Sequence, residues 1–324
     1  GVDGFRVDMA HMVPMHYWKW QTKRCRNRDA DVFFMAEAYD NDPSKLVGGN
    51  VLDALLDSGF DAVYDDPSYD TIKHTVEGQK WANDIDAAAN AFSPRFHKSL
   101  RYAENHDEVR LASKQNWTGA GMEIGRPVSA ILFGLGRGPI MLYNGQEVGE
   151  KADGAEGFSG DDGRSSIFDY WSLPSLTPWV NGHQYDGAKL TDAQKDLRSY
   201  YGRLLKLCAE PAFARGDFYG LNHANKNNEK FGRIDSETVS GHWLYAFLRR
   251  DSASGQTFLV IANIHLSKDL KDIHVQVPED AIKWIGAAVE NKACLLYTSP
   301  SPRDLNPNLG LRRMGEKRGG GGGG

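Results

Sequence analysis

Three short segments of this chain each begin with apolar or aromatic residues and end near a carboxylate. The segments are GFRVDMAHMVP (Gly4–Pro14), FFMAEAYD (Phe33–Asp40) and YAENHDEVR (Tyr102–Arg110), and the carboxylates are those of Asp8, Glu37 and Asp107. Parallel strands of a barrel bring their C-terminal ends, and therefore such carboxylates, to one mouth. Carboxyl groups gathered in this way can act as a nucleophile and as a general acid or base.

The spacing of the three carboxylates fits repeated strand-plus-helix units. Asp8 and Glu37 lie 29 residues apart, about one unit, because a barrel of roughly 250 residues holds eight. Asp107 follows Glu37 by 70 residues, which leaves room for two more units. Further strands are predicted at Gly59–Tyr64 (GFDAVY) and at Pro139–Tyr143 (PIMLY), the latter followed by a polar turn. The pattern therefore predicts an α/β fold with five parallel strands.

The second part of the chain changes character. Residues 193–209 show helical periodicity and predict the last barrel helix, with an apolar face formed by Leu197, Tyr200, Tyr201, Leu204, Leu205 and Leu207. From about Asp217, short alternating strands are predicted at Trp243–Arg249, Thr257–Ile264 and Ile273–Val277. We therefore expect a barrel portion over residues 1–215 and a small antiparallel β-sandwich domain over residues 216–292. Residues 293–324 contain an adapter-like stretch (ACLLYTSPSPRD) and six terminal glycines, and we expect them to be a non-native tail.

The three acidic segments resemble the second, third and fourth conserved regions of the α-amylase family of glycoside hydrolases (family 13), in order, spacing and flanking residues. The later stretch PIMLYNGQE adds to the resemblance. It implies a partial TIM (β/α)8 barrel, strands four to eight, followed by the C-terminal β-domain. It also implies that Asp8 is the nucleophile, Glu37 the general acid/base and Asp107 the carboxylate that stabilises the transition state. By the same resemblance, Arg6 pairs with the nucleophile and His106 hydrogen-bonds the sugar.

The residue types suit a retaining glycosidase. Such an enzyme needs two carboxyl groups roughly 5 Å apart, one ionised to attack the anomeric carbon and one protonated to donate to the leaving oxygen. A neighbouring Arg6 would favour the ionised form of Asp8, whereas Glu37 follows an apolar run and faces other carboxylates, which favours its protonated form. Asp107 would hold ring hydroxyls and offset the positive charge of the transition state.

Each of these residues also has a structural interpretation. Taken alone, Asp8 could be a turn or cap residue, Glu37 a solvated loop acid, and Asp107 a turn former. Arg6 could form a structural ion pair inside the barrel. The predicted substrate-binding residues are Arg6, His106, Asn105, His11 and Arg110. His11 departs from the family pattern, in which many relatives carry a histidine one position later, where Met12 stands, and Arg110 could equally be a salt-bridge partner.

Composition excludes several classes of protein. A formal charge of −5 leaves no basic surface for nucleic acid, and no apolar run approaches the ~20 residues of a membrane span. Cys25, Cys208 and Cys294 show no metal-site spacing, and the polar loop Gly149–Gly163 does not match an EF-hand. We expect no metal on the residues present and no required cofactor. Calcium binding by a full-length protein and the cellular compartment stay open.

The resemblance carries expectations about the whole protein. Because residues 1–8 correspond to the fourth strand of the family barrel, we expect strands one to three and the inserted B domain to be absent. A half-barrel exposes two sheet edges, so we expect this chain as written to aggregate or to be inactive. The complete protein is expected to be a monomeric enzyme that hydrolyses α-glucosidic bonds of starch, glycogen or maltooligosaccharides, or transfers glucosyl units. The alternative is a catalytically silent amylase-like scaffold that binds carbohydrate or a partner.

Aromatic residues in Ser165–Trp171 and Trp179 could contact sugar rings or simply cover the barrel rim.

Overall fold

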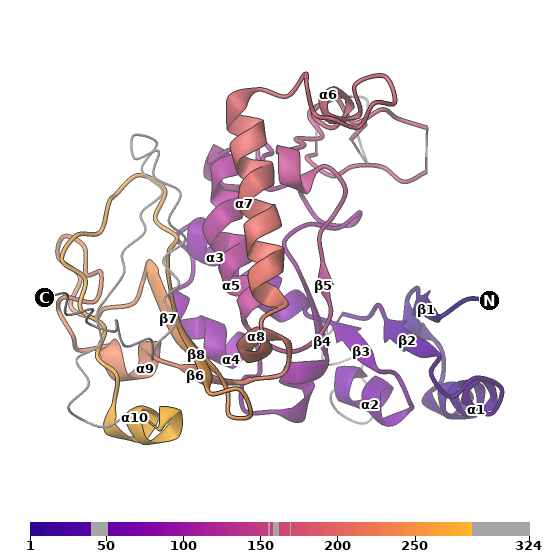
Figure 1. Ribbon diagram of the computed structural model, residues 1–324, viewed down its shortest axis with the longest axis horizontal. Helices are drawn as coiled ribbons and strands as arrows, with labels where there is room; N and C mark the ends of the chain where they lie inside the picture. The colour runs from indigo at the N-terminus through magenta and orange to yellow at the C-terminus, as the bar shows by residue number, and fades with distance from the viewer. Residues whose placement is uncertain (40–50, 155, 158–161, 169, 287–324) are drawn as a thin grey trace, which may run out of the picture.

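The computed structural model describes residues 1–39, 51–154, 156–157, 162–168 and 170–286 (Figure 1). Its first sheet has five parallel strands in the order β1-β2-β3-β4-β5. These are β1 (Gly4–Val7), β2 (Phe33–Ala36), β3 (Ala62–Tyr64), β4 (Ser99–Tyr102) and β5 (Ile140–Met141). The five predicted parallel strands are confirmed, and they form an open half-barrel in the described part of the chain.

Two of the strands are shorter than predicted. The strand predicted from Gly59 begins at Ala62, because Gly59 has a φ of +106° and ends the turn that follows the preceding helix. The strand predicted over Pro139–Tyr143 is regular only at Ile140–Met141, where it pairs with Arg101 and Tyr102 of β4. The register that matters for function lies at the other edge, where Val7 of β1 is opposite Ala36 of β2. The residues that follow these two, Asp8 and Glu37, therefore emerge side by side.

Helices cover this sheet. They are α1 (Met15–Arg26), α2 (Val51–Asp57), α3 (Asp66–Val76), α4 (Ile85–Ala88), α5 (Gly125–Gly134) and α7 (Asp192–Cys208), whereas the short α6 (Thr177–Val180) lies away from the strands (Figure 1). Helix α7 matches the predicted last barrel helix, and a reciprocal capping box between Thr191 and Gln194 fixes its start. Its buried face consists of Leu197, Tyr200, Tyr201 and Leu204, whereas Leu205, which we also expected there, is 38% exposed.

The buried side chains of the half-barrel form two clusters. The first strands and helices share one, which includes Trp18, Phe34, Leu52, Leu55 and Val63. The later strands and helices share the second and larger one, which includes Tyr64, Tyr102, Ile131, Phe133 and Leu204. Val63 and Tyr64 are adjacent residues of β3, so the two clusters meet at this strand.

The C-terminal region contains a three-stranded antiparallel sheet, β6-β7-β8. Its strands are β6 (Asp217–Gly220), β7 (Leu244–Asp251) and β8 (Gln256–Asn263), and its helices are α8 (Pro211–Ala214), α9 (Asn222–Asn225) and α10 (Glu279–Ile285). The strand predicted at Ile273–Val277 is wrong, since these residues are irregular. Within the described residues this region has one sheet, so the predicted two-sheet sandwich is not found there.

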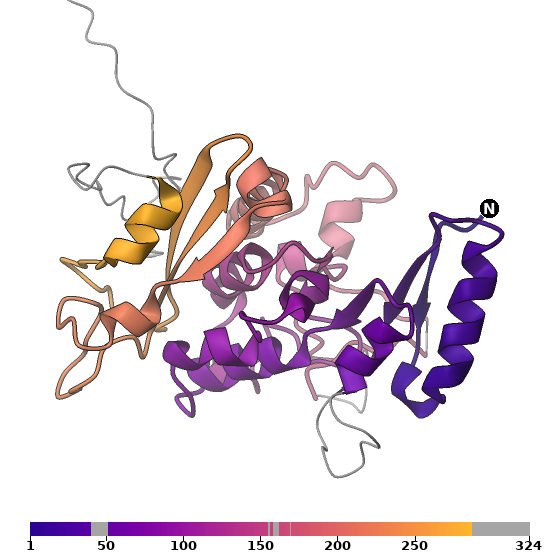
Figure 2. The same ribbon diagram turned by 90° about the horizontal axis from the view of Figure 1, so that it is seen from below.

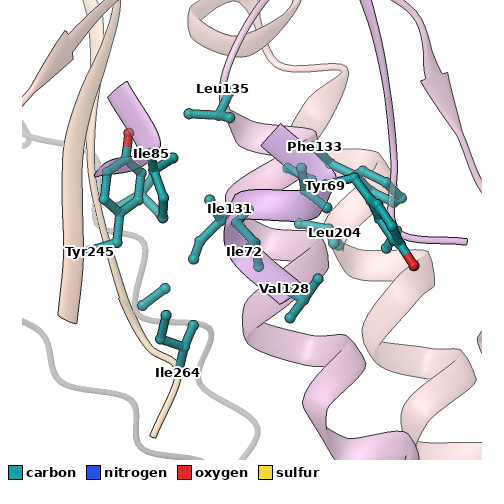
Figure 3. Packing of buried hydrophobic residues seen from close by; sticks show 14 of the residues in the cluster. Tyr69, Ile72, Ile85, Val128, Ile131, Phe133, Leu135, Leu204, Tyr245 and Ile264 are labelled. Atoms are coloured by element: carbon teal, nitrogen blue, oxygen red, sulfur yellow. The ribbon is translucent and has the colours of Figure 1, made fainter. Parts of the chain in front are cut away.

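The single sheet is covered on both faces. Tyr245 and Ile264 face the barrel helices, where they pack with Ile85 and Ile131 (Figure 3). The alternate residues Leu244, Ala246 and Leu248 belong to a separate cluster with Ala281 of α10. Helix α10 (yellow) lies against the strands on the side away from the barrel helices (Figure 2). A helix and loops thus take the place that we had assigned to a second sheet.

Arg249 of β7 connects the C-terminal sheet to the barrel through hydrogen bonds. Its side chain is fully buried and donates to the carbonyl oxygens of Gly134, Leu135 and Gly136, which follow or end α5. It also donates to Ala212, Phe213 and Gly216 around α8, at 3.2, 2.8 and 2.9 Å. The C-terminal carbonyls of a helix lack intrahelical partners and carry partial negative charge, so they suit a buried guanidinium.

None of the helices in the described residues is long and apolar enough to cross a membrane. Cys25 and Cys208 are free thiols, and Cys294 lies outside the described residues together with the tail at 293–324.

Candidate active site

Asp8 and Glu37 meet at the C-terminal ends of two neighbouring strands. The Glu37 amide donates to the carbonyl oxygen of Val7 at 2.9 Å, and the Ala10 amide donates to the carbonyl oxygen of Glu37 at 2.9 Å. These backbone bonds extend the β1–β2 pairing past the last regular residue. The carboxylates differ in exposure, because the Asp8 side chain is 72% exposed and that of Glu37 only 3%.

Arg6 links the two carboxylates. Its Nη1 lies 2.6 Å from Asp8 Oδ1, and its Nη2 lies 3.2 Å from Glu37 Oε2. Burial lowers the pKa of Arg6, but hydrogen bonds to Tyr64 and Asp8 outweigh it and the pKa is raised overall, so the guanidinium stays charged. The structure thus brings together the predicted nucleophile, its arginine and the predicted acid/base. The side-chain contacts of Arg6 go to these carboxylates and to the Tyr64 hydroxyl.

Glu37 is held by donors on both of its oxygens. Oε2 accepts a hydrogen bond from the Met9 amide at 2.7 Å, and Oε1 accepts one from the Tyr39 hydroxyl at 3.0 Å. Met9 adopts a left-handed backbone conformation (φ 45°, ψ 43°), which is uncommon for a residue with a side chain. Burial, followed by the negative charges of Glu37 and Asp107, raises the pKa of Tyr39, so this hydroxyl remains a neutral donor.

Asp107 faces the same space from β4. Its negative charge, like that of Glu37, adds to the burial that raises the pKa of Tyr39 and of Tyr64, so Glu37 and Asp107 both lie near this tyrosine pair, and Asp8 is connected to it through Arg6. The two tyrosine rings meet edge to face, with centroids 6.5 Å apart. His106 lies beside Asp107, with Nε2 3.0 Å from Oδ2. His106 and Asp107 are both partly exposed, at 20% and 37%, so both can reach a ligand.

Two of the other predicted substrate-binding residues, Asn105 and Arg110, have structural partners, and the third is His11. Asn105 is 1% exposed, and its Oδ1 accepts the amides of Asp107 and Glu108, both at 2.8 Å, which makes it a turn-stabilising residue. Arg110 is fully buried and pairs with Glu104 at 2.8 Å. This geometry favours the salt-bridge alternative for Arg110, because a fully buried side chain offers no surface to a sugar. His11 lies half-buried in the short 3-10 helix Ala10–Met12, and its Nδ1 has no hydrogen-bond partner.

Several residues at the site were not predicted. Tyr39 binds Glu37 and Tyr64 binds Arg6, and two further acids, Asp66 and Glu108, lie near Tyr102. Burial raises the pKa of both acids to about 7, with further contributions from Asp70 on Asp66 and from Asp66 on Glu108. One signal was present in the sequence: Tyr39 stands two residues after Glu37, and Tyr64 ends a predicted strand.

No group of three or more His, Cys, Asp or Glu side chains within the described ranges could hold a metal ion. Part of the polar loop Gly149–Gly163 lies outside those ranges. Among the possible aromatic platforms, Tyr170 and Trp171 are exposed, whereas the guanidinium of Arg198 of α7 lies over the Trp179 ring, 4.8 Å from its centroid. Phe168 is 72% exposed.

Comparisons with known proteins agree with this fold. The chain is 30% identical over 153 residues to the α-amylase MalA of Haloarcula japonica, which covers 46% of this chain and 21% of that protein. It is 26% identical over 276 residues to the α-amylase of Streptomyces lividans, covering 81% of this chain and 28% of that protein. The chain therefore spans less than a third of the length of these curated relatives. No family model matches it.

Solved structures of similar fold include an α-amylase from Lactobacillus plantarum, with a TM-score of 0.55, 19% identity, and coverage of 81% of this chain and 52% of that one. A cyclic α-maltosyl-(1→6)-maltose hydrolase from Arthrobacter globiformis has a TM-score of 0.51 at 20% identity, over 81% and 49% of the two chains. At such identities the likeness concerns the fold. Together with the curated relatives, it supports similarity of this chain to α-amylase-type glycoside hydrolases.

Proposed function

We propose that this chain carries the catalytic carboxylates of a retaining α-glucan hydrolase or transglycosylase. The supporting observation is that a single guanidinium, that of Arg6, contacts both Asp8 and Glu37 at adjacent strand ends. In this proposal the exposed Asp8 attacks the anomeric carbon and forms a glycosyl ester. Glu37 protonates the departing oxygen and later deprotonates the attacking water. Asp107 and His106 hold sugar hydroxyls beside them. The required carboxyl separation of about 5 Å remains a prediction.

The contacts of Glu37 favour one of its oxygens as the proton donor. Oε2 accepts a hydrogen bond from the Met9 amide and lies 3.2 Å from the positively charged Arg6 guanidinium, so both neighbours disfavour a proton on this oxygen. Oε1 has the Tyr39 hydroxyl as its hydrogen-bond partner, and a hydroxyl can rotate to accept as well as donate. We therefore assign the transferable proton to Oε1, with Tyr39 as its orienting group.

The substrate in this proposal is an α-linked glucan such as starch, glycogen or a maltooligosaccharide. The relatives named above include α-amylases, and a 48-residue stretch is 40% identical to an α-1,4-glucan:maltose-1-phosphate maltosyltransferase of Mycolicibacterium smegmatis. Hydrolysis and glycosyl transfer share the same first half-reaction, in which Asp8 is glycosylated. We propose a full-length monomer without nucleic acid or membrane partners, and with calcium as its one possible metal.

The test is to trap the glycosyl ester on the full chain. A 5-fluoro-α-glucosyl fluoride should add one sugar to Asp8, detected by intact mass and peptide mapping. Fluoride leaves without protonation, so Glu37→Gln should still be labelled although it no longer cleaves maltooligosaccharides. Asp8→Asn should bind maltooligosaccharides but take no label and show no turnover. Label on another residue, or near-normal turnover by Asp8→Asn, would overturn the nucleophile assignment.

The second candidate, a silent carbohydrate-binding scaffold, is favoured by one observation. In the described residues β1 pairs only with β2, and Asp8 at its end is 72% exposed, so the catalytic site is open on that side. Water-filled sites weaken electrostatic stabilisation of a transition state. We propose for this reason that the 324-residue chain alone turns over slowly, and that Asp8 still takes the label, because labelling needs only the first half-reaction. Maltooligosaccharide binding without any label on Asp8 would support the scaffold.

A further inference from the structure

The loop that carries Asp107 is closed by a buried ion pair. Glu104 and Arg110 stand at its two ends, and Asp107 lies midway, three residues from each. Arg110 Nη1 lies 2.8 Å from Glu104 Oε2, with side chains that are 0% and 1% exposed. The other oxygen of Glu104, Oε1, accepts the amide of Leu111 at 2.7 Å. Both oxygens of one carboxylate therefore hold the far end of the loop.

Inside this closed loop, Asn105 fixes the backbone of Asp107. Its Oδ1 accepts the amides of Asp107 and Glu108, both at 2.8 Å. Asn105 directly follows Glu104, so any movement of the ion pair is transmitted through one residue to the backbone of Asp107. The Asp107 side chain itself stays partly exposed and faces the candidate site.

Arg110 also joins the loop to two other segments. Its Nη1 donates to the carbonyl oxygen of Asn144 at 3.0 Å, and its guanidinium stacks over the Tyr143 ring at 4.1 Å. Its Nε donates to Ser165 Oγ at 2.8 Å, and its backbone amide donates to the carbonyl oxygen of Gly163 at 2.7 Å. One side chain thus connects the loop after β4, the turn after β5 and the Gly163–Ser165 segment.

We propose that Glu104 and Arg110 form a clasp, meaning this ion pair with its bonds to Asn144 and Ser165, which positions Asp107 and couples it to the other two segments. Glu104, Arg110 and Ser165 are positioning residues in this proposal, since none of them faces a substrate. The expected effect of this ion pair on the glycosylation of Asp8 rests on the proposed function. The structural coupling among the three segments is independent of that proposal.

Two measurements on the full chain separate these parts. Hydrogen–deuterium exchange reports the amides of residues 105–111, 143–146 and 163–165 whether or not the chain is active. The rate of Asp8 labelling by the glycosyl fluoride reports the position of Asp107 in the glycosylation step. The variants are Glu104→Gln, which keeps the shape of the side chain but not its charge, and Ser165→Ala, a small change that should fold even if Glu104→Gln does not. Ser58→Ala is the matched control for Ser165→Ala, because Ser58 is equally buried at 2% exposure but its hydroxyl donates to the carbonyl oxygen of Leu55, outside the three segments.

We expect Ser165→Ala and Glu104→Gln to speed exchange in all three segments together. Labelling should slow by about 10-fold and about 100-fold respectively, since a misplacement of about 1 Å costs on the order of 100-fold. Ser58→Ala should change neither quantity. Faster exchange in residues 105–111 alone, or an equal response of Ser58→Ala, would refute the coupling. Wild-type labelling rates in both variants would refute the positioning role. If the unmodified chain takes no label, the proposed function fails, while the exchange data still decide the coupling.

Discussion

The buried carboxyl group of Asp66 makes the stability of this protein depend on pH. Asp66 is the first residue of α3, is 3% exposed, and accepts a hydrogen bond from the Tyr102 hydroxyl at 3.3 Å. Burial, and then the negative charge of Asp70, raises its pKa from 3.8 to about 7. Replacing it by asparagine removes the charge and keeps an oxygen that can accept from Tyr102.

The sign follows from proton binding in the two states. The folded protein keeps the Asp66 proton up to about pH 7, whereas the unfolded chain releases it near pH 3.8. Between these values the folded state binds more protons, so its stability falls as pH rises. Above pH 7 the full cost remains. At about 1.4 kcal/mol for each pH unit, that cost is at most about 4 kcal/mol, and we expect about 2–4 kcal/mol because Glu108 titrates nearby.

Urea unfolding followed by tryptophan fluorescence measures this cost. Asp66→Asn should be more stable than the unmodified chain by about 2–4 kcal/mol at pH 8.5 and by less than about 1 kcal/mol at pH 4.5. The control is Asp31→Asn, because Asp31 is exposed. A stability difference that is equal at the two pH values, or a variant that is less stable at pH 8.5, would show that the carboxylate is not held at a cost in the folded state.

Two further substitutions probe the C-terminal anchor and the acid/base. Arg249→Met leaves six carbonyl oxygens without their hydrogen-bond donor. Thermal unfolding should show that the fold is destabilised by about 3–5 kcal/mol, as when one partner is removed from a buried charged network. An unchanged unfolding midpoint would mean that water replaces the guanidinium. Tyr39→Phe removes the hydrogen-bond donor to Glu37 Oε1 and should slow maltooligosaccharide cleavage by about 10-fold. Labelling by the glycosyl fluoride should be unaffected, because the departing fluoride needs no proton. Equal losses with both substrates would place Tyr39 outside the proton-transfer step.

The sequence predicted the candidate site best where acidic residues stand at the ends of consecutive parallel strands. Strand-ending carboxylates one unit apart predicted that Asp8 and Glu37 would meet, and parallel pairing in register brings them together. Tyr64 was not predicted as a site residue because its bond to Arg6 joins residues 58 positions apart, and strand periodicity carries no information on such a contact. The sandwich expectation failed for a related reason. Alternating apolar residues on β7 show that both faces are buried, but they do not say whether a sheet or a helix covers the second face.

The division of the buried side chains at β3 splits the candidate site between two packing units. Asp8 and Glu37 stand on strands whose side chains belong to the smaller cluster, whereas Asp107 follows β4, whose Leu100 and Tyr102 belong to the larger one. Proteins open in cooperative units that follow such clusters. Local unfolding of the first two strands would therefore carry Asp8 and Glu37 away from Asp107, while most helices and the C-terminal sheet remained folded. The candidate site is in this sense an assembly of two foldons, and it persists only while both are closed.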